Sequence, residues 1–376
     1  MRQLEGHILT PQGFLRGVMT FGDDGRIAEL RGEPVHEREV RAASCPLLLP
    51  GFIDLHVHGG GGHDIMEGGD ALRRVSEVHA RHGTTAMLAT TMTAPVVDLD
   101  AAFAAMHALG LQRSAAGARV LGVHLEGPYI SQEKLGAQPD FTRPMVASEL
   151  QRWHALFPIR VVTLAPEVPG NMDLIESLCA AGFRVQIGHS AGNYEDGKQA
   201  LSKGAGSFTH LFNAMTPLHH RTPGMVGAAL AHAQFAEIIP DLIHVHPGAI
   251  RVALRAIPGL YCVTDSTAAA GMPDGEYRLG RHTVTKCLGG VRLPDGTLAG
   301  STLTMDQALR NLVDGLGLSL SDASRHVSTH AADYLGVTDR GRLSTGAWGD
   351  VVRLDRDLKL MDVWLEGSSI EHTDAE

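Results

Sequence analysis

The sequence predicts an α/β protein built on a (β/α)8 TIM-type barrel, and three observations favour this fold. Eight short apolar segments rich in β-prone residues recur along the chain, as the buried strands of a parallel sheet do. Ala- and Leu-rich helical segments separate most of them. Polar residues gather at the C-terminal ends of the apolar segments, where the active sites of such barrels lie. The eight expected strands are 53–58, 84–90, 120–126, 160–166, 184–189, 207–212, 238–245 and 260–265, and the clearest expected helices are 70–81, 98–109, 171–181 and 249–256.

The two ends of the chain differ from this central pattern. Residues 1–49 and 336–376 contain short alternating segments broken by turns such as Asp23-Asp24-Gly25. Neither end could bury a core alone, so we expect them to pair as one small β-sandwich domain. A chain of 376 residues suits such an arrangement, with 50–335 as the catalytic barrel.

Charge and composition limit the classes of partner. The chain has 32 Lys and Arg against 42 Asp and Glu, a net charge of −10. This balance argues against nucleic acid or an anionic membrane as the main partner, although a few converging cations could still bind an anionic substrate. Residues 1–10 lack the apolar core of a signal peptide, no apolar run reaches membrane-spanning length, and the four cysteines are widely spaced. We therefore expect a cytoplasmic protein with reduced cysteines.

The first candidate site follows Pro50-Gly51, where an apolar segment carries His56 and His58. Side chains alternate between the two faces of a strand, so both histidines project from the same face. Two imidazoles at a strand end could supply two ligands of a divalent metal. The run Gly59–Gly62 then leaves room for a substrate. An isolated pair of this kind can instead be two core histidines, so the interpretation depends on the other strands.

Three further expected strands carry residues of metal-binding type at or near their C-terminal ends. Glu126 ends the third expected strand, His189 the fifth, and His210 lies in the sixth. Each has a structural alternative, an arginine-paired glutamate or a core histidine. Their equivalent positions, together with His56 and His58, favour a metal site at the carboxyl end of the barrel.

The eighth expected strand ends in Asp265. A carboxylate at this position could take a proton from an activated water and deliver it to a leaving amine. The alternative is an aspartate that caps the following turn. After the seventh strand, His244 is a candidate for substrate contact, whereas His246 is more consistent with a structural role.

Several of these segments resemble known signatures. Residues 49–59, with the sequence Leu-Pro-Gly-Phe-Ile-Asp-Leu-His-Val-His-Gly, resemble the opening signature of the amidohydrolase superfamily. Within it, the chain resembles the N-acetylglucosamine-6-phosphate deacetylase family over nearly its whole length. The segments that carry this second resemblance are 124–128, 188–190, 209–215, 263–265 and 298–305, of which 124–128 and 209–215 are the most specific.

The resemblance implies roles for individual residues. Glu126, His189 and His210 would hold the principal divalent metal, and Asp265 would be the general acid and base. Some members of the family replace the first two histidines and keep one metal; this chain retains His56 and His58, which favours a second metal. The family often has a histidine where this chain has Gln138, and a neutral amide contacts a phosphate more weakly than a cationic imidazole does. The residues assigned to the sugar phosphate are Ala137, Gln138, Asn213, Ala214, Arg221, His244, Leu298, Ala299 and Gly300.

The activity implied is removal of acetate from N-acetylglucosamine 6-phosphate by a homodimer with one or two divalent metals per chain. Zinc is the expected metal, with iron, cobalt or manganese as alternatives. Three rival functions are considered: deacetylation of another N-acetylhexosamine such as N-acetylgalactosamine 6-phosphate, hydrolysis of a cyclic amide or isopeptide, and non-catalytic sensing of a sugar phosphate. Cyclic-amide hydrolysis would have no use for Asn213, Ala214 and Arg221, and a sensor would need neither Asp265 nor the metal ligands.

Overall fold

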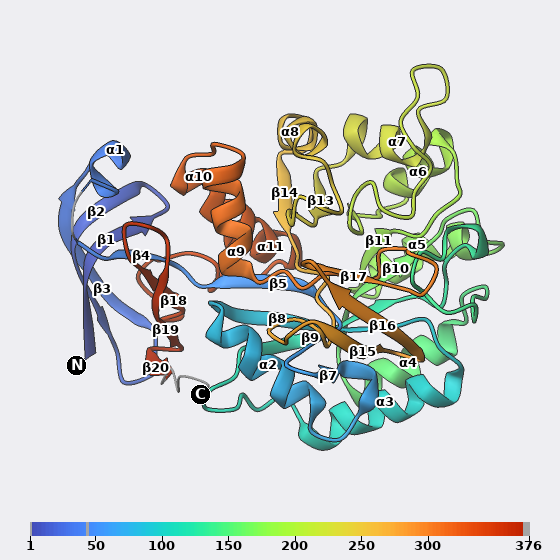
Figure 1. The fold of residues 1–376 in the computed structure, drawn as a ribbon, viewed down its shortest axis with the longest axis horizontal. Coiled ribbons are helices and arrows are strands. Elements are labelled where there is room, and N and C mark those ends of the chain that lie inside the picture. The colour runs from blue at the N-terminus through green and yellow to red at the C-terminus, as the bar shows by residue number, and fades with distance from the viewer. Residues whose placement is uncertain (1, 43–44, 371–376) are drawn as a thin grey trace.

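The computed structural model describes residues 2–42 and 45–370. Its centre is a curved sheet of six parallel strands in the order β12-β11-β10-β9-β8-β5, beside the parallel pair β13-β14 (Figure 1). The burial of nearly every residue in these strands explains their continuous apolar character. The strands are β5 (Phe52–Val57), β8 (Thr84–Thr91), β9 (Arg119–Glu126), β10 (Ile159–Leu164), β11 (Arg184–Ile187), β12 (Ser207–Phe208), β13 (Phe235–Ile238) and β14 (Gly259–Cys262).

Backbone contacts close these eight strands into a ring. Beyond β12, the Leu211 amide donates to the carbonyl of Glu237 in β13 at 2.9 Å. Beyond β14, the Asp265 amide donates to the carbonyl of His56 in β5 at 2.9 Å, and Ser266 forms a parallel bridge with Val57. The predicted (β/α)8 barrel is therefore confirmed.

The prediction for the seventh strand is wrong in position. We expected 238–245, but β13 spans Phe235–Ile238 and the chain then leaves the sheet. Pro240 has no amide hydrogen for a ladder, and Leu242 has a φ of 65°, which extended backbone does not allow. The Asp241 carboxylate accepts from the amides of the two residues after Leu242, forming a turn. The apolar residues of 242–245 thus belong to a loop that enters the active-site region.

The expected strand 207–212 keeps only its first two residues as a strand. His210 and Phe212 have φ angles of 28° and 82°, and residues in this left-handed region cannot continue a β ladder. The other six strands begin within one residue of the predicted positions.

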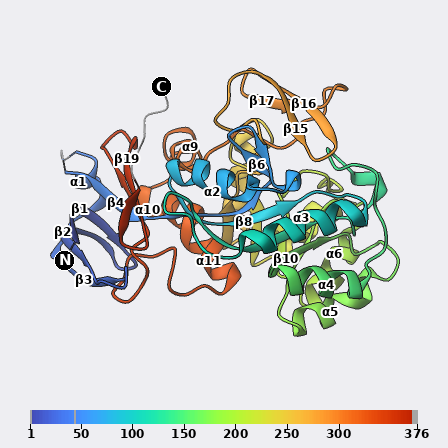
Figure 2. The same cartoon turned by 90° about the horizontal axis from the view of Figure 1, so that it is seen from below.

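Helices cover the outside of the barrel, as Figure 2 shows for α2, α3 and α4. The rings of Phe103 in α3 and Trp153 in α4 stack with centroids 5.7 Å apart, which joins neighbouring helices. His246 accepts a hydrogen bond from the Gly248 amide at the start of α8, so it caps this helix. The helices are α1 (Glu37–Val40), α2 (Ala71–Arg81), α3 (Val96–Leu109), α4 (Ala147–Leu156), α5 (Asn171–Ala180), α6 (Tyr194–Ser202), α7 (Gly224–His232), α8 (Pro247–Ala256), α9 (Met305–Arg310), α10 (Leu320–Ser324) and α11 (His330–Leu335), with short irregular turns η1 (Ile65–Glu67), η2 (Gln132–Lys134), η3 (Asn311–Gly315) and η4 (Arg325–Thr329).

Both ends of the chain contribute to one seven-stranded sheet in the order β20-β19-β18-β4-β1-β2-β3 (Figure 1). Phe21 of β2 stacks on Trp364 of β19 at 5.2 Å, although three strands lie between β2 and β19 in the sheet. The sheet therefore folds over its own core, in the manner of a sandwich. The bounds 1–49 and 336–376 for this domain stay a prediction. Its strands are β1 (Arg2–Thr10), β2 (Gly13–Phe21), β3 (Ile27–Pro34), β4 (Leu47–Pro50), β18 (Val351–Leu354), β19 (Leu360–Leu365) and β20 (Ser368–Ile370).

An insertion after β14 forms a small antiparallel sheet that the sequence analysis did not predict. It consists of β15 (Gly275–Leu279), β16 (His282–Cys287) and β17 (Gly290–Arg292), and in Figure 2 it lies along the upper side of the barrel. Leu279, Val284 and Val291 pack with Met92 in a separate small core. This insertion presents Leu279 to the cavity described below. Two shorter strands, β6 (Gly59–Gly60) and β7 (His63–Asp64), follow β5.

Within residues 2–42 and 45–370, no helix combines the length and the apolar character needed to cross a membrane.

Glu366 connects the terminal sheet to the barrel. It follows β19, and its carboxylate accepts from Arg119 at the start of β9 at 2.8 and 2.9 Å. Arg113 and Arg340 also pair with it. Burial by itself would raise the pKa of Glu366, but the hydrogen bonds from Arg119 and Arg340 outweigh it and lower the pKa to about 2.

Glu366→Gln is expected to lower the free energy of unfolding by about 3 kcal/mol at pH 7, because it leaves the three arginines without their shared counter-charge. The folded-state pKa lies below the ordinary value of 4.5. This contribution is therefore fully present above about pH 4.5 and is lost as the pH falls toward 2. Urea unfolding of both proteins from pH 7 to pH 3 measures it. The control Glu29→Gln breaks only an exposed pair with Arg31 and should cost less than about 1 kcal/mol; equal losses in the two variants would contradict this account.

Candidate active site

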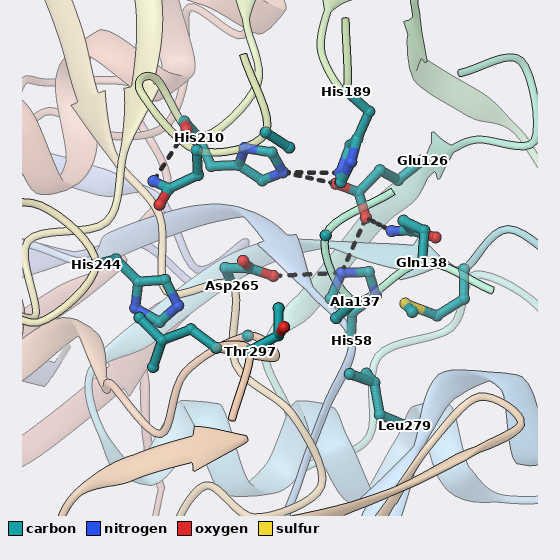
Figure 3. A pocket seen from close by; sticks show the side chains of 16 residues that line it. His58, Glu126, Ala137, Gln138, His189, His210, His244, Asp265, Leu279 and Thr297 are labelled. Atoms are coloured by element: carbon teal, nitrogen blue, oxygen red, sulfur yellow. Dashed lines mark hydrogen bonds and ion pairs between the residues drawn. The ribbon is translucent and has the colours of Figure 1, made fainter. Parts of the chain in front are cut away.

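A cavity of about 220 Å³ opens at the carboxyl ends of the barrel strands (Figure 3). Most of the residues predicted to form a site meet there, although they come from segments far apart in the sequence. The predicted residues that line the cavity are His58, Glu126, Ala137, Gln138, His189, His210, Asn213, Ala214, His244, Asp265, Leu298 and Gly300.

Three side chains form a first triangle of donor atoms. The Glu126 Oε1 atom lies 3.1 Å from His189 Nε2 and 3.0 Å from His210 Nε2, and the two nitrogens lie 3.1 Å apart (Figure 3). Ligand atoms at the corners of a tetrahedron with bonds of 2.0–2.1 Å are about 3.3 Å apart. The triangle therefore has the size that one metal ion requires, and all three side chains are buried.

Local backbone conformation turns these side chains toward the barrel axis. His189, His210 and Asp265 leave their strands with φ angles of 47°, 28° and 50°. A non-glycine residue in this region costs about 1–3 kcal/mol, and such strain is concentrated at functional sites. The Nδ1 atom of His189 bonds to the carbonyl of Lys134 at 2.8 Å, which leaves its Nε2 free to face Glu126.

A second triangle lies next to the first. The Nε2 atoms of His56 and His58 are 3.1 Å apart, and Asp265 Oδ1 lies 3.4 and 3.3 Å from them. Glu126 stands between the triangles, because its Oε1 faces His189 and His210 while its Oε2 lies 3.2 Å from His58 Nε2. Each oxygen of the Glu126 carboxylate thus lies against one of the two triangles.

Electrostatics also favours cations in this site. Burial alone would lower the pKa of His56 and His58, but the carboxylates around them outweigh it, raising the pKa of His56 well above its ordinary value and that of His58 to about 9. The charges on the same histidines lower the pKa of Asp265 to about 2, although its burial acts in the opposite direction. Buried carboxylates thus require positive charge, and a divalent cation bound to neutral imidazoles supplies it in place of protons. The donor set fits a divalent metal.

Gln138 supports Glu126. Its Nε2 atom donates to Glu126 Oε2 at 2.5 Å, and its Oε1 accepts from the Thr93 amide at 2.7 Å. Both polar ends of this buried side chain are therefore occupied by protein groups. Gln138 lines the cavity, but its amide nitrogen is held by Glu126, a candidate metal ligand. A contact with phosphate would require this amide to leave Glu126, and the substrate contact of Gln138 stays a prediction.

His244 has a defined orientation in the cavity wall. Its Nδ1 bonds to Asp241 Oδ2 at 2.6 Å, which leaves Nε2 for a ligand. Gly300 also lines the cavity, with a φ of 62°, and a Cβ added there would lie 2.6 Å from a methyl group of Thr267. Only glycine fits at this position of the wall.

Three predicted residues lie outside the cavity wall. His56 is fully buried, whereas Ala299 packs into the small core of the β15–β17 sheet. Arg221 is exposed on the loop before α7, where its Nη1 lies 2.7 Å from His220 Nε2. The structure does not bring Arg221 to the other site residues, and its phosphate contact stays a prediction.

The sequence analysis missed Glu237, a fully buried carboxylate in β13 that touches His56. A signal was present, because a charged residue inside the apolar segment 235–239 is costly unless it is paired. It also missed Met92, Gly136, Leu279 and Thr297, which line the cavity. None of these four carries a titratable or metal-binding group that could have identified it.

A (β/α)8 barrel whose strand ends gather histidines and carboxylates around a cavity defines a hydrolase of the metal-binding barrel class. Residues 47–370 match the model of the amidohydrolase family, and the chain belongs to this family.

Comparison with individual proteins narrows the class. The chain is 40% identical to the N-acetylgalactosamine-6-phosphate deacetylase of Escherichia coli O157:H7, with 96% of each chain covered. It is also 40% identical to an N-acetylglucosamine-6-phosphate deacetylase of Lysinibacillus sphaericus, over 90% of this chain and 89% of that protein. A solved structure of a variant N-acetyl-D-glucosamine-6-phosphate deacetylase from Mycobacterium smegmatis, in complex with N-acetyl-D-glucosamine-6-phosphate, aligns with a TM-score of 0.87 at 32% identity, over 97% of this chain and 98% of that one. The resemblance inferred from the motifs is confirmed.

Proposed function

We propose that the protein hydrolyses the acetamide of N-acetylglucosamine 6-phosphate, giving glucosamine 6-phosphate and acetate. The observation that carries the proposal is the cavity in which the Glu126–His189–His210 triangle faces Asp265, in a chain whose relatives are named as deacetylases of such sugar phosphates. N-acetylgalactosamine 6-phosphate is the second candidate substrate, because the relative from Escherichia coli is named for it.

Glu126, His189 and His210 would hold the principal divalent metal, and His56 and His58 a second one. When bound, such an ion polarises a carbonyl and lowers the pKa of water. A donor set of two histidines and one glutamate suits zinc, with iron, cobalt or manganese as alternatives.

Asp265 is the proposed general base and acid. Its side chain is 11% exposed and faces the cavity, where it would take a proton from the attacking water and pass it to the departing amine nitrogen. Its backbone is fixed on both sides: its amide donates to the carbonyl of His56, and its carbonyl accepts from the Ser301 amide at 2.7 Å. A base held in this way keeps its geometry through the reaction.

The remaining wall would bind and shield the sugar. Leu279 and Leu298 are apolar and would exclude water above the reacting amide. The free Nε2 of His244 is placed to hydrogen-bond the substrate, and Asn213 and Ala214 lie at the same wall.

We infer a cytoplasmic homodimer as the working form of the enzyme.

The direct test is acetate release from N-acetylglucosamine, N-acetylgalactosamine and N-acetylmannosamine, each with and without the 6-phosphate. We expect the highest kcat/KM for N-acetylglucosamine 6-phosphate. A clear preference for the galactosamine epimer would replace the first substrate with the second. No acetate release from any of the six sugars by metal-loaded protein would refute the proposed function.

Arg221 is the proposed partner of the 6-phosphate. Because it is exposed beyond the cavity wall, it would reach the phosphate by closure of its loop or from the second chain of the dimer. Arg221→Ala should lower kcat/KM about 10–100-fold for the phosphorylated sugar, the value of a charge-assisted hydrogen bond, and leave the unphosphorylated sugar almost unaffected. Arg255→Ala, at the end of α8, is the control and should change neither rate. Equal losses for both sugars in Arg221→Ala would exclude a role in phosphate recognition.

A further inference from the structure

Glu237 lies in the middle of β13 with no exposed surface, and it does not line the cavity. Its Oε2 atom is 3.0 Å from His56 Nδ1 and 3.1 Å from the backbone amide nitrogen of His210. Its Oε1 atom lies 3.5 Å from the hydroxyl of Tyr261. A buried carboxylate destabilises the folded protein unless hydrogen bonds satisfy it. The contacts of Glu237 with His56 and His210, two candidate metal ligands, indicate the function of this carboxylate.

The contact with Glu237 determines which ring nitrogen of His56 carries the hydrogen. A carboxylate accepts hydrogen bonds only, so His56 must place its hydrogen on Nδ1 to bond with it. The lone pair of Nε2 then points at the second triangle, where His58 Nε2 is 3.1 Å away. With the opposite tautomer, Nε2 would carry a hydrogen and could not bind a metal.

The first triangle depends on Glu237 far less. His189 and His210 both face Glu126 through Nε2, and Glu237 touches only the backbone of His210. The nearby His124 does not take the place of Glu237, since its two ring nitrogens bond to the carbonyl of Leu55 and the hydroxyl of Thr163. Within the described residues, Glu237 is thus the side chain that orients His56 toward the second triangle.

We propose that Glu237 is a positioning residue that prepares His56, and through it the second metal position, without touching substrate. The inference rests on the proposed function, because it concerns the same site. It predicts that loss of Glu237 weakens binding at one metal position and spares the other.

The test is titration of metal-free protein with Co²⁺, followed by calorimetry and by elemental analysis after dialysis. Wild-type protein should bind two ions per chain. Glu237→Gln keeps an amide oxygen that can accept from both N–H groups, so affinity at the second position should fall only about 10-fold. Glu237→Leu removes the acceptor, and the same affinity should fall about 100-fold, while the first position changes less than about threefold.

Two further variants calibrate the titration. His56→Asn removes the imidazole itself and should show the isotherm of a protein with the first position alone. Glu149→Gln is the matched control, because Glu149 is a partly buried glutamate whose hydrogen bonds go to Tyr129 and Arg143. It should bind two ions as wild type does.

Unchanged affinity at the second position in both Glu237 variants would overturn the proposal, and so would equal weakening of both positions, which would indicate a merely structural role. If Glu237→Leu does not fold, nitrogen NMR of ¹⁵N-histidine-labelled wild-type protein loaded with Zn²⁺ decides, because a bound metal keeps the ring neutral, and His56→Asn assigns the signal. The His56 ring should carry its hydrogen on Nδ1; a hydrogen on Nε2 in the loaded protein would overturn the proposal.

These outcomes are separate from the fate of the proposed function, because the titration does not depend on turnover. A wild-type protein that binds one Co²⁺ per chain in excess metal, yet releases acetate, would refute the role of Glu237 and leave a one-metal deacetylase. A protein that binds two ions as described but releases no acetate would refute the proposed function and leave the role of Glu237 intact.

Discussion

His210→Ala is expected to lower kcat by at least about 10³-fold and to reduce bound metal at the first triangle in parallel. His210 Nε2 contributes one of three donor atoms spaced 3.0–3.1 Å apart, and its loss leaves an incomplete site. The stabilisation that a metal gives to a developing charge amounts to several kcal/mol, and each 1.4 kcal/mol corresponds to about one decade in rate. Elemental analysis and acetate release on the same preparation measure both effects.

The matched control is His246→Ala. His246 also lies at a junction between the barrel and a helix, but its ring only caps α8. Loss of this cap should cost about 1 kcal/mol of stability and leave metal content and kcat unchanged. Full metal content with full activity in His210→Ala would remove His210 from the proposed ligands.

Asp265→Asn is expected to lower kcat about 10²–10⁴-fold, the usual contribution of general acid–base catalysis. The amide has nearly the same size but cannot accept the proton of the attacking water. The first triangle does not contain Asp265, so the metal held by Glu126, His189 and His210 should remain. The readouts are steady-state acetate release and the metal content of each variant.

A surface variant separates this effect from a general loss of negative charge. Asp314→Asn changes an aspartate that is 54% exposed and paired with Arg41, and it should leave kcat unchanged. If Asp265→Asn kept more than about a tenth of wild-type kcat with full metal content, Asp265 would be excluded as the proton carrier.

Much of the site could be predicted because it depends on local pattern. Alternation along a strand places His56 and His58 on one face, and parallel strands in a barrel bring their carboxyl ends to one rim. Glu126, His189 and Asp265 could therefore be assigned from the sequence alone to one site at this rim of the barrel. The error at β13 has a local cause as well: apolar residues extend past Pro240, and residue type alone does not distinguish an extended segment from a loop that passes through the core.

Other features could not be predicted because they require distances across the closed barrel. Glu237 lies 181 residues from His56, and only the neighbouring positions of β13, β14 and β5 bring the two together. The sequence alone indicates that Gln138 is a weak phosphate ligand. In the folded chain its side-chain oxygen accepts from the Thr93 amide, and its side-chain nitrogen donates to Glu126. The exposure of Arg221 likewise depends on where its loop lies in space.

The sequence by itself indicated the barrel and the chemical types of the candidate ligands, since periodicity and residue chemistry are local properties of a chain, and the resemblance of its motifs indicated the family. Only the tertiary structure decided which donor atoms lie about 3 Å apart, and hence that the site has two triangles joined by Glu126. The physical reason is that hydrogen bonding and metal coordination vary steeply over tenths of an ångström. Distances on that scale are set by closure of the ring of strands and by the left-handed residues at their ends.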